Sequence, residues 1–444
     1  MKNLMLFLGI SAFGSLAYAG SAGNVESWRA EWLAKRGSPV AEAPRKEDHA
    51  EDVVDELRWT TLGEMEQANA QAAALENIPW SDSYWPHYAG SVAYRYADPG
   101  MKKEKEWDKN ERYVVKNLGR GLPGELSPAE KYDRLVGDRR FTLTRWALAQ
   151  GRKYFEKDGK VESWMGLCHG WAPAAVMEQR VTKSVTARAP DGAKILFYPA
   201  DLHALATLLW AEGKFPMKLI GGRCTDKEPE REENGRLKSP DCLDTNPGTW
   251  HLAIVNQLAA SRRALLFDAS FDHEVWNYPI YKYAYHYVKE GSDEKFTSWE
   301  DAAIPLSDAD RARAPRAEGA TMLVRVKMEI SYSIPRDPAA YTEDDGTLDK
   351  KSDATYDYEL ELNADGKILG GEWLSKDHPD FLWAPGPGAV AVTGADQALD
   401  KAKNAERWDE ARHVPRGWRK AAAESSAKGQ PLARVVQELL RRGR

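Results

Sequence analysis

The sequence predicts an α+β fold, in which a helical region packs on an antiparallel sheet. Residues 127–212 carry helix-start signals and runs of helical length, whereas residues 320–375 alternate between apolar and polar side chains. Because the two periodicities occupy different parts of the 444-residue chain, helices and strands are expected to segregate along it.

Helices are expected first in the middle of the chain. The segment 127–130 (Ser-Pro-Ala-Glu) combines a capping serine, a proline at the first helical position and a glutamate at the third. The run 141–155 predicts a second helix, Cys168 begins a third, and Asp201 caps a fourth over 202–212. The C-terminal end is also predicted to be helical, because its apolar residues form one stripe: Leu432, Val435, Val436, Leu439 and Leu440.

Strands are expected after residue 250. The short apolar runs 251–256 and 263–268 indicate two neighbouring strands. Tyrosines alternate over 281–287, which predicts a strand with one aromatic face. Alternation over 322–334 and again over 356–362, followed by an Asn-Ala-Asp-Gly turn, predicts a run of antiparallel strands.

The N-terminus indicates export. Residues 1–19 contain a lysine, a mostly apolar stretch and an Ala-Tyr-Ala cleavage site, which is the pattern of a signal peptide. No later run has the roughly 18 apolar residues of a transmembrane segment, so the mature chain is expected to be secreted or periplasmic. The net charge of −6 without a long basic block argues against a nucleic-acid partner.

The three cysteines predict one disulfide and one free thiol. Cys224 and Cys242 lie in a polar loop rich in proline and glycine, so a disulfide is predicted between them, and Cys168 stays free. No histidine pair has zinc-ligand spacing, and the acidic turn 343–346 lacks the spacing of a calcium loop. The sequence therefore implies no metal and no other cofactor.

The chain divides into five predicted parts. After the signal peptide, residues 20–79 are charged and helical in pattern, and form either a pro-segment that restrains the protein or an ordinary helical layer. Residues 80–300 are expected to form a catalytic region, residues 301–395 a β-rich region, and residues 396–444 a helical tail.

Cys168, His251 and Asp268 are the candidate catalytic residues. A thiol at a helix N-terminus is favoured as thiolate, the nucleophile of thiol acyltransferases. His251 begins one predicted strand and Asp268 ends the next, so the two are expected side by side. Cys168 would attack an acyl carbonyl, His251 would move the proton, and Asp268 would orient the imidazole. His273 is the reserve base, whereas His169, which is adjacent to Cys168, is expected to point elsewhere.

Each of these residues also has an ordinary structural interpretation: an inert buried thiol, a core histidine and a turn aspartate.

The Cys168 N–H and the Trp164 indole are the candidate oxyanion donors. Three tryptophans near the motifs, Trp164, Trp171 and Trp250, are candidates for substrate binding.

Several segments carry a resemblance to a known family. They are 85–90 (Trp-Pro-His-Tyr-Ala-Gly) with 93–95, 126–133, 166–173 (Gly-Leu-Cys-His-Gly-Trp-Ala-Pro), 249–251, 275–283 (Val-Trp-Asn-Tyr-Pro-Ile-Tyr-Lys-Tyr), 370–373 and 378–383. With these segments the chain resembles the transglutaminase elicitors of oomycetes and their bacterial relatives, over roughly 80–383. The segment 275–283 looks like the surface peptide by which plants recognise these proteins, with Tyr278 where the family usually has glutamine.

The resemblance implies a protein-glutamine γ-glutamyltransferase that works without calcium, with Cys168 as the matching nucleophile. Its partners would be proteins that offer glutamine and lysine side chains. Two alternatives stay open on the same residues. One is an exported cysteine peptidase or amidase with the same triad, and the other is an exported surface-binding protein without catalysis.

Overall fold

The structure is a computed structural model that describes residues 48–222, 226, 230, 245–270, 273–289, 291–313, 315–375, 377–403, 406–408 and 412–444. The predicted signal peptide at 1–19 lies outside these residues, and so do both cysteines of the predicted disulfide, Cys224 and Cys242. The signal peptide and the disulfide therefore stay predictions. Within the described residues, no helix is both long and apolar enough to cross a membrane.

One antiparallel sheet organises the described chain. Its main strands are, in spatial order, β11 (Ile368–Trp373), β10 (Lys350–Leu362), β9 (Met322–Ile334), β6 (Asn277–Val288), β5 (Leu265–Asp268), β12 (Phe381–Pro385) and β4 (Met217–Gly221). Short strands β1 (Ala72–Ala74) and β7 (Lys295–Phe296) pair with β6, and β8 (Ile304–Pro305) pairs with β9. A separate hairpin joins β2 (Val185–Arg188) to β3 (Lys194–Phe197). The strands predicted from alternation, β6, β9 and β10, are thus confirmed.

The helices lie mostly in the middle and at the end of the chain. They are α2 (Leu62–Gln67), α3 (Trp107–Asn117), α4 (Pro128–Val136), α5 (Thr142–Asp158), α6 (Cys168–Met177), α7 (Pro199–Glu212), α8 (Pro247–Val255) with its π-helical extension 256–260, α9 (Trp299–Ala302), α10 (Asp308–Arg313), α11 (Gly394–Lys401), α12 (Arg416–Ser426) and α13 (Ala433–Gly443). The predicted start of α4 is confirmed, because Ser127 and Glu130 cap each other's backbone N–H groups.

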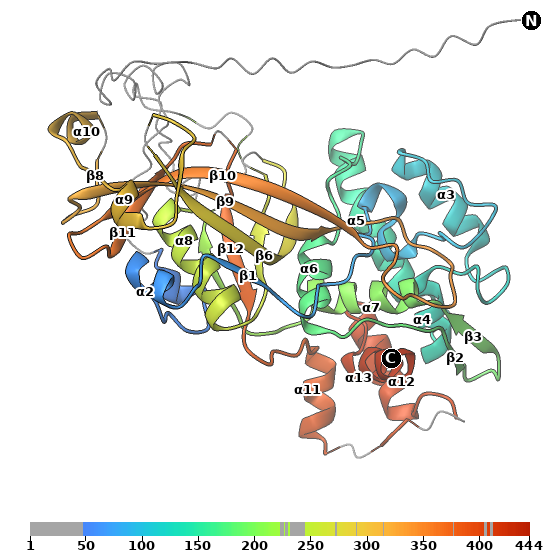
Figure 1. Ribbon diagram of the computed structural model, residues 1–444. Helices are drawn as coiled ribbons and strands as arrows, with labels where there is room; N and C mark the ends of the chain where they lie inside the picture. The colour runs from blue at the N-terminus through green and yellow to red at the C-terminus, as the bar shows by residue number, and fades with distance from the viewer. Residues whose placement is uncertain are drawn as a thin grey trace, which may run out of the picture.

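The sheet separates two hydrophobic cores. Leu266 of β5 and Trp383 of β12 pack with the helices α4–α7 in one core. Their strand neighbours Phe267 and Leu382 pack with α8 in the other, because successive side chains of a strand point to opposite faces. Figure 1 shows α4–α7 gathered beside the sheet, and α8 with α2 against a different part of it.

The predicted strand over 251–256 is wrong, because this segment belongs to helix α8. A short run that is apolar on every side has no periodicity that separates a buried strand from a buried helix. The helix-start signal lies just before the run: the Asn246 side chain accepts from Gly248 N at 2.9 Å, and Pro247 takes the first helical position. Helix α7 likewise begins at Pro199, so Asp201 lies in its first turn, where its carboxylate accepts from Tyr198 N at 2.7 Å.

The segment before residue 80 is less helical than its composition predicts. Its described part, 48–79, contains the single-turn 3₁₀ helix Ala50–Asp52, the short α2 and strand β1. Leu62 and Met65 of α2 are fully buried, and β1 extends the sheet beside β6. Residues 48–79 therefore belong to the second core as a structural layer, while a restraining role for the whole segment 20–79 stays a prediction.

The C-terminal end of the described chain forms helices α11–α13 and belongs to the first core. Its apolar stripe lies on and beside α13, where Leu439 and its stripe neighbours are almost fully buried. Helix α13 packs on α7, and the chain ends there (Figure 1). The tail therefore completes the core that supports α6 and α7.

We expect Leu439→Ala to lower the free energy of unfolding by about 2–5 kcal/mol, because it removes a fully buried side chain and leaves a cavity. Leu439 is 0% exposed, whereas Leu122 is 66% exposed, so Leu122→Ala is the matched control and should change stability by less than about 0.5 kcal/mol. Urea denaturation measures both variants. Equal, small effects would show that α13 is not part of the cooperative core.

Candidate active site

Cys168 is the first residue of α6, at the end where backbone N–H groups have no intrahelical acceptor. Two glycines allow this placement. A Cβ on Gly170 would overlap the Thr207 carbonyl oxygen of α7, and a Cβ on Gly166 would lie too close to the Tyr84 carbonyl oxygen. The flanking glycines thus let α6 approach α7 and the 84–87 loop closely, which fixes the thiol in space.

Cys168 lies on a cavity of about 790 Å³. Helices α6 and α7, strands β4 and β12 and the chain just before β6 supply most of its wall. The lining side chains that bear on the chemistry or on apolar contact are His87, Trp164, Cys168, His169, Trp210, Phe215, Met217, Leu219, Asn277, Phe381 and Trp383. A thiol, two imidazoles and a broad apolar wall therefore share one cavity.

The sulfur of Cys168 contacts the start of β6. Its thiol donates to the Val275 carbonyl oxygen at 3.5 Å, and the Asn277 Nδ2 donates to the sulfur at 3.6 Å. The Asn277 Oδ1 accepts in turn from the Trp383 indole at 2.7 Å. Because an indole N–H only donates, this bond holds the amide oxygen and directs the amino group to the sulfur.

The environment of Cys168 acts on its pKa in both directions. Burial raises the pKa of the thiol above its ordinary value, and the nearby Asp268 carboxylate raises it further. The backbone N–H and side chain of Asn277 lower the pKa, as does the backbone N–H of His169. N–H groups thus stabilise the thiolate within a site that otherwise favours the neutral thiol.

Asp268 lies at the end of β5, as predicted, and on the face of the sheet that carries Cys168. It pairs directly with Asn277 across β5 and β6, so the two side chains share a face. Its Oδ1 accepts from Trp276 N at 2.8 Å and from the Ser270 hydroxyl at 2.9 Å. Asp268 therefore holds the turn that leads into the Asn277 contact.

His251 lies on the other side of the sheet. Its Nδ1 is 2.8 Å from the Tyr358 hydroxyl and its ring packs edge-on to Tyr285, and both tyrosines belong to the second core. Burial lowers the pKa of His251 to about 3. Its hydrogen bond and ring contacts reach neither Cys168 nor Asp268, so His251 as the base stays a prediction that this geometry does not support.

Two other histidines, His87 and His169, line the cavity with Cys168 and are called here the cavity histidines. The His87 ring stacks on Tyr154, and its buried Nδ1 has no hydrogen-bond partner among the described residues. Burial lowers the pKa of His87 to about 4, with a further lowering from the charge of His169. The reserve base, His273, packs edge-on against Trp164, and its Nε2 lies 3.9 Å from the Glu162 carboxylate.

The three tryptophans predicted to bind substrate lie in different places. Trp164 lines the cavity and its indole donates to Glu162 at 2.7 Å, so its role as an oxyanion donor stays a prediction. Trp171 is fully buried in the first core, edge-on to Tyr278, and Trp250 is fully buried in the second. A fully buried ring offers no surface to a substrate.

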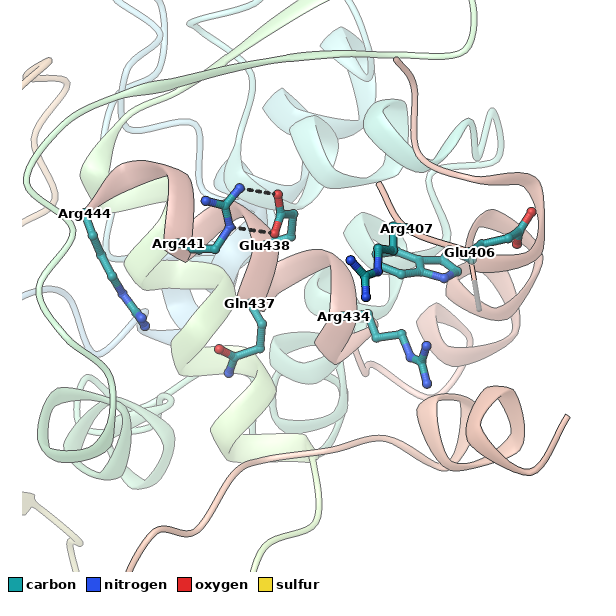
Figure 2. Close-up of a pocket in the computed structure, with 8 residues that line it drawn as sticks. Glu406, Arg407, Arg434, Gln437, Glu438, Arg441 and Arg444 are labelled. Carbon is teal, nitrogen blue, oxygen red and sulfur yellow. Dashed lines mark hydrogen bonds and ion pairs between the residues drawn. The ribbon is translucent and has the colours of Figure 1, made fainter. Parts of the chain in front are cut away.

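A second cavity, of about 570 Å³, lies at the C-terminal helices and carries no nucleophile. Figure 2 shows Gln437, Glu438 and Arg441 on α13 and Arg444 just after it, with two hydrogen bonds from the Arg441 guanidinium to Glu438. Among the described residues there is also no cluster of three or more His, Cys, Asp or Glu side chains that would hold a metal ion.

Sequence reasoning missed Asn277, Trp383 and His87 as site residues. All three belong to segments that carry the family resemblance, at 85–90, 275–283 and 378–383. Their place in these segments was the available signal. The segments contain polar and aromatic side chains that the predicted triad does not use, and such side chains are candidates for a site. Their meeting at Cys168 depends on strand order, which no local pattern contains.

Comparison with known proteins supports the resemblance. The family model described as transglutaminase elicitor matches residues 59–402. The crystal structure of the GP42 transglutaminase from Phytophthora sojae has a similar fold, with a TM-score of 0.51 at 19% sequence identity over 85% of this chain and 97% of that one. No curated protein matches the sequence. Because the family model spans most of its length, the chain belongs to the transglutaminase elicitor family.

Proposed function

We propose that the protein is an exported protein-glutamine γ-glutamyltransferase with Cys168 as its nucleophile. The observation that carries this proposal is the setting of the Cys168 sulfur. It lies at a helix start, contacts the Asn277 amide at 3.6 Å and opens on a cavity that also holds two imidazoles. A reactive thiol needs such donors and a proton carrier, whereas an inert core cysteine needs neither.

The reaction proceeds in two halves. The Cys168 thiolate attacks the side-chain carbonyl carbon of a glutamine, and a C–S bond forms. The C–N bond then breaks, and ammonia leaves with the proton that the thiol had given up. In the second half a lysine amine attacks the thioester and passes its proton to the imidazole, the C–S bond breaks, and the thiolate is restored. The Cys168 backbone N–H, at the start of α6, is the proposed oxyanion donor.

The cavity histidines are the proposed proton carriers in place of His251. A carrier must lie within hydrogen-bond reach of the reacting atoms once the substrate is bound, and His87 and His169 share the cavity with the sulfur. The low pKa of His87 keeps its imidazole neutral at pH 7, which is the form that accepts a proton. Asp268 then acts through its contacts with Ser270 and Trp276, beside Asn277.

Replacing Cys168 tests the proposal directly. Wild-type protein should release ammonia from a glutamine peptide and incorporate a primary amine, with EGTA present, because the proposed chemistry uses no calcium. Cys168→Ser should lower both rates by a factor of about 10³ or more, with an unchanged melting temperature. Ammonia release without amine incorporation would identify a hydrolase. Residual transfer within tenfold of wild type would exclude Cys168 as the nucleophile.

Histidine variants separate the two assignments of the base. We expect the double variant His87→Ala/His169→Ala to lower kcat by about 10²–10⁴ while the fold is retained. His251→Ala should instead lower stability, because it empties a buried site beside Tyr358, and should leave the activity per folded molecule near wild type. The opposite pattern, with His251 essential and the cavity histidines dispensable, would restore the triad predicted from the sequence.

The pH profile of Cys168 alkylation tests the electrostatics of the site. Iodoacetamide reacts with the thiolate, so its rate should rise with pH through the pKa of Cys168. Asn277→Ala removes a donor that lowers this pKa, and the profile should move to higher pH. Asp268→Asn removes a charge that raises the pKa, and the profile should move to lower pH. Shifts in the same direction would contradict the assigned contacts.

A further inference from the structure

Beside Cys168 the cavity has an apolar side that the reaction itself does not use. We call it the apolar shelf and define it by five lining residues: Phe215, Met217, Leu219, Phe381 and Trp383. Trp383 and Leu219 are paired across β12 and β4, so their side chains point to the same face of the sheet. This is also the face that carries Asn277 and the Cys168 contact.

The outer part of the shelf is open to solvent. Met217 is 48% exposed and Leu219 is 50% exposed, although both are large apolar side chains. They are two residues apart on β4, hence about 7 Å apart on one face of the strand. Phe381 and Trp383 of β12 are buried, by contrast, and Trp383 lies beside Leu219 on the same face of the sheet. The shelf therefore has a buried side on β12 and an exposed side on β4.

Charge in the cavity agrees with an apolar occupant. The described residues that line the cavity include no aspartate or glutamate. Apart from the two cavity histidines, the basic residue among them is Lys214. The backbone of Lys214 is hydrogen-bonded in both directions with Val392, one residue before Phe215 of the shelf. A bulky apolar side chain on the shelf would lose its contact with water against apolar side chains, without displacing a carboxylate of the described lining.

We propose that the apolar shelf binds a bulky apolar side chain of the acyl-donor peptide, within two residues of the reactive glutamine. This inference rests on the proposed function, because it takes the Cys168 thioester as the reason for a glutamine to enter. The shelf is continuous with the Cys168 cavity, so one short peptide segment reaches both. The substrate class is thus a glutamine with a neighbouring leucine, phenylalanine or similar residue.

Two peptides of equal length test this specificity, one with leucine two residues from the glutamine and one with serine at that position. Wild-type protein should use the leucine peptide with a kcat/KM about tenfold higher or more, as contacts in an apolar pocket usually give. The double variant Met217→Ser/Leu219→Ser should lose this preference and use the two peptides with kcat/KM values within about twofold of each other. Both positions are half exposed, so the fold is expected to tolerate the changes.

Leu122→Ser is the matched control, since Leu122 is 66% exposed and does not line the cavity. It should keep the wild-type preference. A preference that survives in the double variant, or equal use of the two peptides by wild type, would overturn the proposal.

A binding measurement separates failure of the shelf from failure of the proposed function. Isothermal titration of Cys168→Ala protein with both peptides needs no catalysis. Suppose that wild type transfers no acyl group, but that the leucine peptide binds more tightly than the serine peptide and loses this advantage when Met217 and Leu219 are replaced. The transferase proposal then fails, and the apolar site stands. Equal binding of the two peptides would overturn the shelf whatever the activity.

Discussion

The hydrogen bond from the Trp383 indole to the Asn277 carboxamide sets the geometry around the thiol. It joins β12 to β6, two strands about a hundred residues apart in sequence that lie on either side of β5. An indole cannot accept a hydrogen bond, so the amide has one orientation, with its amino group toward the sulfur. The arrangement of the whole site follows from this, because α6 must place Cys168 where that amino group points.

The sheet works as a partition as well as a scaffold. Residues of one parity on β5 and β12 face α6 and the thiol, and residues of the other parity face α8 and the tyrosines around His251. The thiol and its polar contacts thereby lie on one face, and the second core, with its stacked tyrosines and buried Trp250, supports the strands from the other. The C-terminal helices serve the first core in the same way, through α7.

Much of the fold could be predicted from the sequence, because its signals are local. The alternation over 322–334 and the capped start of α4 each lie within a few residues, and both elements formed as expected. The helix α8 was missed because a uniformly apolar segment takes its conformation from its surroundings. Of the candidate site, Cys168 and Asp268 lie on one face as expected. His251, the partner predicted for them, does not lie on that face. It belongs to helix α8, and the strands that flank β5 are β6 and β12.

The burial of Cys168 has a consequence for how long such a thiol survives in an oxidising compartment. The side chain is only 4% exposed, and its pKa is raised, chiefly by burial. The thiolate is the nucleophile that attacks peroxides and small disulfides, so burial and a raised pKa both slow sulfenic acid formation and mixed-disulfide exchange. Resting protein is thus protected without a reductant, and the sulfur becomes reactive chiefly toward a molecule that enters the cavity and is held there.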